Sequence, residues 1–215
     1  MITLAAPTVM RIDAVALAPR VRERFGGELR RAGTFAQICL LGAQACLDAA
    51  PPRGALGMLW ASGRGAVGAA RAALAESAGG EPVMPFTLVG TLPHLAATLL
   101  AQRGAPLARA AFVHVRPGGW PWLLGLAQAW LAGCDRVLLG WVEEARESEG
   151  THQSDWCVLQ REKAEVSCEP LPESRGALPV TSADWLACVA AWLAAPREPL
   201  ALRGGAEAWR FSAAR

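Results

Sequence analysis

The segment AAFVHVRPGGWPWLLGLAQAWLAGCDRVLLGWVEE, residues 110–144, decides the fold class. It opens with the apolar run Ala110–Val115 and closes with the apolar run Arg136–Val142, and neither run alternates apolar with polar residues. Between them the glycine-containing segment Arg116–Gly119 leads into an apolar stretch of helix length, Trp120–Ala132. Strands without alternation are covered on both faces, as in sheets flanked by helices. We therefore expect a strand, a tight elbow, a buried helix and a second central strand.

The same alternation of strand and helix continues towards the N-terminus. Phe35–Ala50 is rich in helix formers and has apolar residues on nearly all sides, which predicts a buried helix. Thr91 is the expected N-cap of a later helix, with Pro93 in its first turn. In chain order we expect a strand over 7–18, an arginine-rich loop over 20–31, the helix over 35–50, a strand over 55–61, and helices over 66–77 and 91–103.

Towards the C-terminus the acidic stretch Glu143–Gly150 predicts a solvated loop, and Asp155–Cys168 has the periodicity of a strand. A helix is expected over Ser182–Ala194, capped by Ser182, and a hairpin with Gly204 and Gly205 at its turn. The fold class is therefore α/β, with a mixed, mostly parallel sheet and helices on both faces.

Length and charge limit the possible functions. The 215 residues suffice for one core, which we expect over residues 1–150, with residues 151–215 completing the same domain. The formal net charge is only +2, and no stripe of one sign could follow a phosphate backbone, so a nucleic-acid reader is excluded. Neither a secretory signal nor an apolar run of ~18 residues is visible, so we expect a cytoplasmic protein without a membrane span.

The cysteines and histidines do not indicate a metal site. The cysteines form no CxxC pair, and the histidines are scattered, so we expect buried thiols, no zinc and no cofactor. The turn Ser62–Gly65 lacks the spacing and the GK[ST] ending of a phosphate loop. The six cysteines are Cys39, Cys46, Cys134, Cys157, Cys168 and Cys188, and the three histidines are His94, His114 and His152.

Two motifs resemble the N-terminal half of a β-ketoacyl synthase of the thiolase-like superfamily. PFTLVGTLPHLAATLLAQRGAP, residues 85–106, is similar to the helix that precedes the nucleophile strand in that family, and GCDRVLLGWVE, residues 133–143, is similar to its "G.aD..l.Gg.E" strand. The resemblance covers roughly residues 36–143 and implies a thiolase-like layered fold. The motif positions are Thr91, Pro93, His94, Gly133, Asp135, Gly140 and Glu143.

The departures from the family pattern concern the active site. Counting back from Gly133, the nucleophilic cysteine of the family falls at Arg116, and the glycine that follows the nucleophile falls at Gly119. An arginine stays protonated and cannot attack a thioester. The family's catalytic histidines lie in the C-terminal half, and we expect this chain to keep about one lobe plus a short C-terminal helix and hairpin.

A ketosynthase-like chain without a nucleophile resembles the chain-length-factor subunit of type II synthases. Short forms of this subunit, which keep mainly the first half of the fold, resemble the subunits of aryl polyene and dialkylresorcinol pathways. The resemblance implies a heterodimer with a catalytic β-ketoacyl synthase in fatty acid or polyketide biosynthesis, with indirect contact to acyl carrier protein. It also implies that the strand 110–115 lies at the dimer contact. A homodimer is possible for the isolated chain. An apolar strand left on an open edge would promote aggregation, which favours a permanent partner.

The residues around the elbow are the candidates for interface or tunnel positions. They are His114, Gly118, Gly119, Trp120 and Trp122. The two tryptophans follow the glycines directly, so they are interpreted as plugs or interface anchors, because aromatic and arginine side chains dominate interface centres. The competing interpretation of the tryptophans is ordinary packing at a helix N-terminus. For His114, two residues before Arg116, a catalytic role is the alternative to a packed or interface histidine.

Two other functions remain open. The chain could be a stand-alone acyl-binding protein or acyltransferase that uses another nucleophile, such as Cys134 or a Ser/His pair. Cys134 lies in a turn between helix and strand, where nothing in the sequence lowers the pKa of its thiol. Alternatively, the chain could be a homo-oligomer that binds a hydrophobic ligand through a tryptophan-rich surface.

Overall fold

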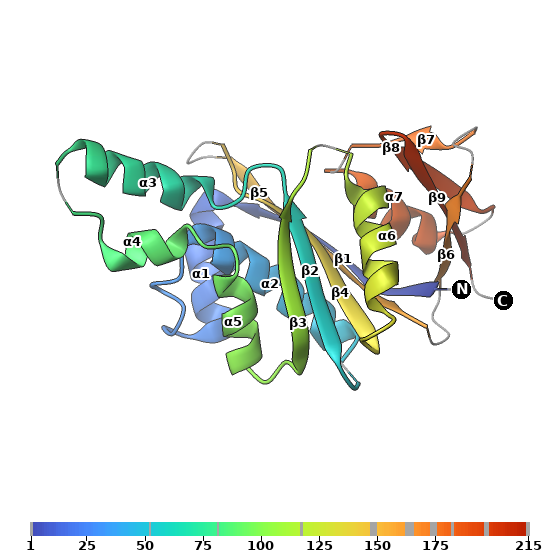
Figure 1. Ribbon diagram of the computed structural model, residues 1–215, viewed down its shortest axis with the longest axis horizontal. Coiled ribbons are helices and arrows are strands. Elements are labelled where there is room, and N and C mark those ends of the chain that lie inside the picture. Colours follow the sequence, from blue (N-terminus) through green and yellow to red (C-terminus); the bar gives the residue numbers. More distant parts are fainter. Residues whose placement is uncertain are drawn as a thin grey trace.

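The computed structural model describes residues 2–213 apart from 52, 81, 117, 147–149, 162–165, 173–175, 182 and 196–197. One sheet crosses the molecule, with helices on both of its faces (Figure 1). Its strands are β1 (Ile2–Asp13), β2 (Leu56–Ser62), β3 (Leu107–His114), β4 (Arg136–Glu143), β5 (Thr151–Gln160), β6 (Val166–Leu171), β7 (Leu178–Pro179), β8 (Leu200–Gly204) and β9 (Glu207–Ala213). The helices are α1 (Ala14–Phe25), α2 (Thr34–Ala49), α3 (Val67–Ala78), α4 (Pro85–Gly90), α5 (Leu95–Gln102), α6 (Trp120–Trp130) and α7 (Trp185–Ala194).

Within the described residues the strand order is β3-β2-β4-β5-β1-β6-β9-β8-β7. Strand β2 is parallel to β3 and β4, and β7 is parallel to β8. The other neighbouring pairs are antiparallel. The expectation of a mixed sheet with helices on both faces is confirmed, but the expectation that it is mostly parallel is wrong. A short connection after β4 returns the chain as β5, and short connections produce antiparallel neighbours.

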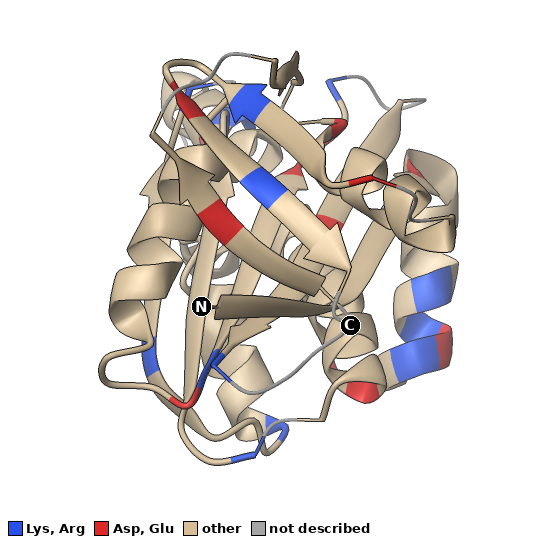
Figure 2. Cartoon of the chain, turned by 90° about the vertical axis from the view of Figure 1, so that its right-hand side faces the viewer, with Lys and Arg blue, Asp and Glu red and all other residues tan. Residues whose placement is uncertain are grey.

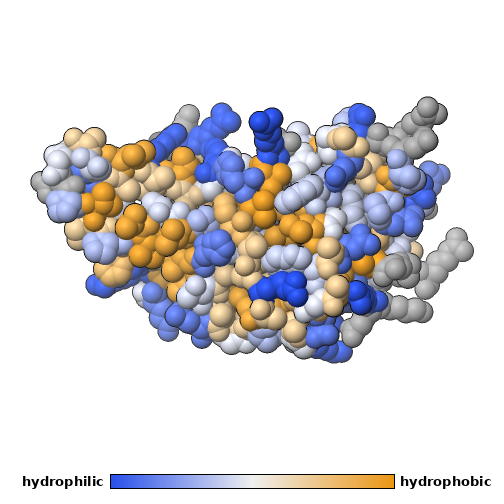
Figure 3. Space-filling model, viewed as in Figure 1, coloured by the Kyte–Doolittle hydropathy of each residue, from blue (hydrophilic) through white to orange (hydrophobic). Residues whose placement is uncertain are grey.

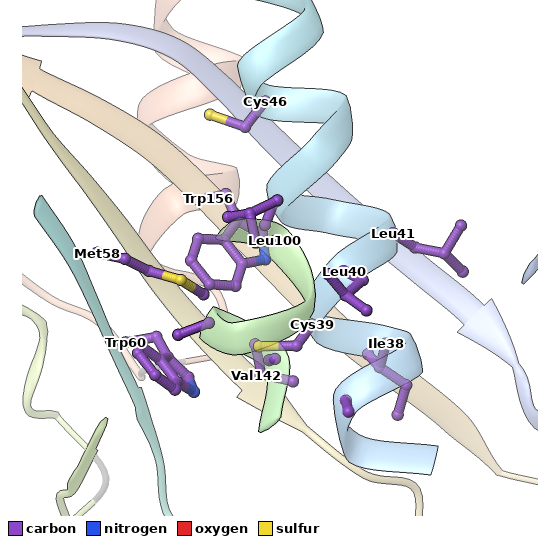
Figure 4. Close-up of a cluster of buried hydrophobic side chains, with 14 of the residues drawn as sticks. Ile38, Cys39, Leu40, Leu41, Cys46, Met58, Trp60, Leu100, Val142 and Trp156 are labelled. Carbon is purple, nitrogen blue, oxygen red and sulfur yellow. The ribbon is translucent and has the colours of Figure 1, made fainter. Parts of the chain in front are cut away.

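Two apolar cores cover the two faces of the sheet. Met58 and Trp60 of β2 point to one face, where α1, α2 and α5 pack. Leu59 and Ala61 point to the other face, where α6 and α7 pack. All four side chains are fully buried, as the continuous apolar run predicts for a central strand. Figure 4 shows part of the first core, in which Met58 and Trp60 of β2 and Trp156 of β5 lie beside α2.

The N-terminal expectations were wrong in two places. The first strand runs over Ile2–Asp13 and not over 7–18, and the arginine-rich segment begins as helix α1 and not as a loop. Leu17, Val21 and Phe25 recur every four residues and bury one face of α1, while the arginines between them lie outside. Burial of these helically spaced apolar residues therefore favours a helix here, although the segment contains several arginines and Pro19.

The helix expected from Thr91 is shorter than predicted, because a separate helix precedes it. Thr91 follows α4, and its hydroxyl donates to the Leu88 carbonyl at 2.7 Å, so Thr91 ends α4 and does not cap α5. Pro93 lies in the turn between the two helices, and α5 begins at Leu95. The other helices and strands of the N-terminal half lie within a few residues of their expected bounds.

The C-terminal segment adds strands to the same sheet. The single strand expected over Asp155–Cys168 is two strands, β5 and β6, both of which pair with β1. The hairpin is confirmed as β8 and β9, with Gly205 in its turn at φ +65°. Helix α7 begins at Trp185, and the expected cap Ser182 lies outside the described residues. The division at residue 150 stays a prediction.

The far end of the molecule, seen in Figure 2, carries β6, β8 and β9 and both chain ends. Acidic and basic residues are interspersed on this side, and Arg210 of β9 pairs with Glu169 of β6 at 3.4 Å. The sheet ends here at β7, which has two residues, one of them Pro179. Its opposite edge is the eight-residue strand β3.

Candidate functional site

The elbow between β3 and α6 is the position at which the resemblance expects a nucleophile. The amide of Val115 donates to the Ser62 carbonyl at 3.2 Å and extends the β3 ladder by one bond. Arg116 follows and is exposed, while Pro117 lies outside the described residues. Gly118 has φ +92°, a conformation that side chains disfavour. The backbone turns sharply there, and α6 begins at Trp120.

Gly119 lies against the strand that it follows. A Cβ at this position would overlap the side chain of Val115, so only a glycine fits here without displacement. Glycine is therefore favoured at both positions for different reasons. Gly118 adopts a left-handed backbone conformation, and Gly119 lies too close to Val115 for a side chain. Their role in an interface or tunnel stays a prediction.

The C-terminal hairpin packs directly on the elbow. A Cβ on Gly204, the last residue of β8, would lie 2.9 Å from Pro121 Cδ and overlap the carbonyl oxygen of Gly118. Trp209 of β9 donates its indole N–H to the Pro121 carbonyl at 3.1 Å. Figure 1 shows the start of α6 close to β8 at the top of the sheet. The elbow is therefore covered on this side by the chain's own hairpin.

The two tryptophans after the elbow have different surroundings. Trp120 is 1% exposed and packs in the second core against Trp141, with ring centroids 6.3 Å apart. Trp122 is 44% exposed. Of the pair, only Trp122 could contact a partner without rearrangement of the core. His114 is exposed at the end of β3, where it pairs in register with Ser62.

Most family-motif positions hold the sheet and its loops together. Asp135 accepts the amide of Ala55 at 2.6 Å and so links the loop before β2 to the start of β4. A Cβ on Gly140 would overlap the indole ring of Trp156, and a Cβ on Gly133 would overlap the guanidinium of Arg109. In the motif at residues 85–106, the ring of His94 packs edge-on against Trp60, with ring centroids 5.5 Å apart.

The end of β4 carries two adjacent carboxylates, and the sequence reading of this stretch as a solvated loop is wrong at its start. Glu143 accepts hydrogen bonds from the Ser62 hydroxyl at 3.1 Å and from the amide of Gly63, which fixes the turn after β2. Glu144 is 3% exposed and accepts the amide of Gly68 at 2.6 Å. Residues 147–149 lie outside the described part of the chain.

Glu144 caps the start of helix α3 and lies near the start of helix α2. Burial raises the pKa of its carboxyl group, while the backbone N–H groups of Gly68 and Phe35 and the charge of Arg64 lower it. Gly68 is in the first turn of α3 and Phe35 in the first turn of α2. A negative charge is favourable at a helix N-terminus, where backbone donors lack partners within the helix. Nothing in the sequence distinguished Glu144 from an ordinary surface glutamate.

A group of apolar side chains stands exposed on α3, α4 and the residues beside them. We name it the arm patch, and it comprises Leu74, Met84, Phe86, Leu88, Val89 and Leu92. No residue of α3 is buried, and six large apolar residues that are all at least 40% exposed exceed what scattered surface residues explain. Figure 3 shows these apolar side chains gathered over α3 and α4, on the same face of the molecule as β3.

The cysteines lie mostly in the two cores. Burial raises the pKa of the Cys39 and Cys157 thiols, and it raises those of Cys46 and Cys168 to about 12. Cys134 is 6% exposed and borders a shallow cavity of about 300 Å³ together with Asp135 and Arg161. Among the described residues, no three His, Cys, Asp or Glu side chains gather in a way that could hold a metal ion.

In the described part of the chain no helix is long and apolar enough to cross a membrane. No family model matches the sequence. No curated protein matches it either.

Solved structures do match the fold. One is the ketosynthase ApeO in complex with its chain length factor ApeC from Xenorhabdus doucetiae, with a TM-score of 0.67, 13% identity and 98% of each chain covered. The complex AntDE:AntF, a type II acyl carrier protein with its ketosynthase bound to the hexaketide, gives a TM-score of 0.64 and 10% identity over 99% of each chain. The ishigamide ketosynthase/chain length factor gives 0.57 and 11% over 79% of this chain and 67% of that one.

These matches confirm the fold that the two motifs led us to expect, a ketosynthase-like fold of the thiolase-like kind. Because 98% of both chains is covered in the ApeO/ApeC match, the matched chain is about as long as this one. The roles of the individual elbow residues stay predictions.

Proposed function

We propose that this chain is a non-catalytic, ketosynthase-like subunit of the chain-length-factor type, which pairs with an active β-ketoacyl synthase in type II fatty acid or polyketide biosynthesis. The observation that carries the proposal is the elbow. By the count back from Gly133, Arg116 takes the position of the family's nucleophile, and the hairpin turn at Gly204 packs on the neighbouring backbone of Gly118. A permanently protonated guanidinium cannot form an acyl intermediate, and the backbone contact closes one side of the elbow.

The exposed face of the molecule supports a partner. Strand β3 is an edge strand whose outer side lacks a neighbouring strand among the described residues. The arm patch lies on the same face (Figure 3). An open edge and a large apolar surface are each a liability in an isolated chain, because both promote association. A partner that pairs with β3 and covers the arm patch would remove both liabilities, with Trp122 as a candidate aromatic anchor.

The solved structures support the choice of partner. The ApeO/ApeC structure contains a ketosynthase together with its chain length factor, and the AntDE:AntF structure contains an acyl carrier protein together with its ketosynthase. By analogy we propose a heterodimer with a catalytic ketosynthase, indirect contact with acyl carrier protein, an aryl polyene type of product and a cytoplasmic location.

Co-expression tests the pairing. The tagged chain is expressed with a catalytic ketosynthase sought among the genes that flank its own. The complex is sized by chromatography with light scattering, where we expect one copy of each chain. Leu88→Asp and Leu92→Asp place a charge in the arm patch at side chains that are 56% and 55% exposed. Val15→Asp is the matched control, because Val15 is 77% exposed on α1, outside the patch. The patch variants should weaken capture roughly tenfold or more, since burying an unpaired charge is costly.

A monomer that captures no ketosynthase, or equal capture by the patch variants and the control, would contradict the pairing. The absence of catalysis has a separate test. The complex is incubated with an acyl thioester, and each chain is weighed by mass spectrometry. An acyl adduct is expected on the ketosynthase alone. An adduct on Cys134 of this chain would instead support the acyltransferase alternative, and a well-defined homo-oligomer without a partner would support the ligand-binding alternative.

A further inference from the structure

A cavity on the opposite side of β4 and β5 from the second core, away from the elbow residues, has the chemistry of a small-anion site. It measures about 370 Å³ and opens between the starts of α1, α2 and α3 and the segment that follows β4. Small-molecule sites in proteins occupy about 300 Å³ or more, so the space suits a small metabolite. Arg116 and the other elbow residues do not border this cavity.

The lining combines apolar side chains with several hydrogen-bond donors, two of which belong to the exposed arginines Arg71 and Arg146. Arg71 of α3 and Arg146 after β4 both border the cavity, and neither has an ion pair or hydrogen bond within the described residues. The hydroxyl of Thr34, the first residue of α2, likewise has no partner in this part of the chain. An arginine guanidinium carries five donors and no acceptor.

His152 supplies a further donor from a nearly buried position. It is 5% exposed, and its Nδ1 accepts the amide of Ala145 at 2.9 Å. Burial lowers the pKa of His152, and because Nδ1 accepts a hydrogen bond, the proton of the neutral ring lies on Nε2. That N–H has no acceptor among the described residues, and His152 borders the cavity. This N–H can therefore donate to a ligand that enters the cavity.

The one carboxylate in the lining does not neutralise these donors. Glu144 is almost fully buried, and its carboxylate is directed at the first turns of α2 and α3. Its Oε2 accepts the amide of Gly68, its buried Oε1 has no hydrogen-bond partner, and neither oxygen pairs with Arg71, Arg146 or His152 within the described residues. A ligand that pairs with these three side chains has to supply acceptors.

We propose that this cavity binds a small phosphate ester, whose phosphate group is held between Arg71 and Arg146 with His152 Nε2–H as a further donor. A phosphate offers more acceptor oxygens than a carboxylate, which matches donors that come from α2, α3, β5 and the segment after β4. Binding would also link α3, which has no buried residue of its own, to the end of β4.

Thermal shift and calorimetry test the site on the full chain at constant ionic strength, with chloride as the reference anion. The probes are inorganic phosphate, glycerol 3-phosphate and acetate. We expect both phosphates to raise the Tm and glycerol 3-phosphate to bind at least as tightly as inorganic phosphate. Arg71→Gln and Arg146→Gln should each weaken binding roughly 10- to 100-fold, because each removes charge-assisted hydrogen bonds. Arg20→Gln is the control, since Arg20 is exposed on α1 and does not border the cavity.

Hydrogen exchange gives a second readout that does not depend on stability of the variants. Saturating glycerol 3-phosphate should slow exchange in α3 of the wild-type chain and leave α7 unchanged. The proposal is overturned if phosphate and chloride act alike, if acetate binds as well as phosphate, or if Arg71→Gln and Arg146→Gln bind like Arg20→Gln.

Discussion

Replacing Gly204 with alanine tests whether the hairpin is packed on the elbow as tightly as the structure indicates. The added Cβ would lie 2.9 Å from Pro121 Cδ and would overlap the Gly118 carbonyl oxygen. Ordinary carbon contacts are about 3.5–4 Å, so turn and elbow must separate by roughly 0.6 Å or more. Overpacking of this kind typically lowers the free energy of unfolding by about 1–3 kcal/mol. For a chain of this size the Tm should fall by about 2–4 °C per kcal/mol.

Two other glycines serve as matched controls. Gly125 in α6 has no neighbour within 4 Å of an added Cβ, so Gly125→Ala should raise stability by about 0.5–1 kcal/mol through the helix backbone alone. Gly205 has the same free space but φ +65°, so Gly205→Ala should cost about 1 kcal/mol of backbone strain without displacing the elbow.

Urea unfolding under reducing conditions, followed by tryptophan fluorescence, measures all three variants. Gly204→Ala should be the least stable of the three and should change the fluorescence of the folded state, because the indole of Trp209 bonds to the Pro121 carbonyl. If Gly204→Ala matches the wild-type chain within about 0.5 kcal/mol, the range of ordinary surface substitutions, the close packing of hairpin and elbow is refuted.

Two further predictions concern buried groups. Because burial raises the pKa of Glu144 in the folded chain, the folded state binds its proton more tightly than the unfolded state, so this group's contribution to stability should improve as the pH falls through the raised pKa. Unfolding free energies of the wild-type chain and Glu144→Gln between pH 7 and pH 4.5 check this, and a difference that stays constant with pH would contradict it. Trp120→Ala should cost about 3–5 kcal/mol, because the ring is buried. Trp122→Ala should change stability by about 0.5 kcal/mol or less and weaken ketosynthase capture; equal stability losses in the two variants would contradict the different placement of the rings.

The sequence predicted the elements whose signal is local. Strands β2, β3 and β4 were predicted from the continuous apolar runs at Leu56–Trp60, Ala111–Val115 and Val137–Trp141. Side chains of these strands pack against apolar residues on both faces of the sheet. The two ketosynthase-like motifs predicted the fold, since their glycines and Asp135 sit where backbone and side chains approach closely.

What the sequence could not indicate depends on contacts between distant segments. Gly118 and Gly204 meet only because the C-terminal hairpin folds back over the elbow, and no local pattern records such a contact. Glu144 looked like part of an acidic surface loop, yet two helix starts converge on it. Helix α1 was missed for the opposite reason, because its arginines and Pro19 concealed a regular apolar face.

The two ends of the sheet also set how large an assembly could become. Strand β3 offers eight residues for pairing, whereas β7 offers two, one of which is a proline that has no N–H to donate. Among the described strands, only β3 offers an edge long enough to add a strand from another chain. Once β3 is paired, whether with another ketosynthase-like chain or with a second copy, no comparable edge is left among the described strands for a third chain to join. If the proposed pairing uses β3, we expect a closed pair of chains and not a filament.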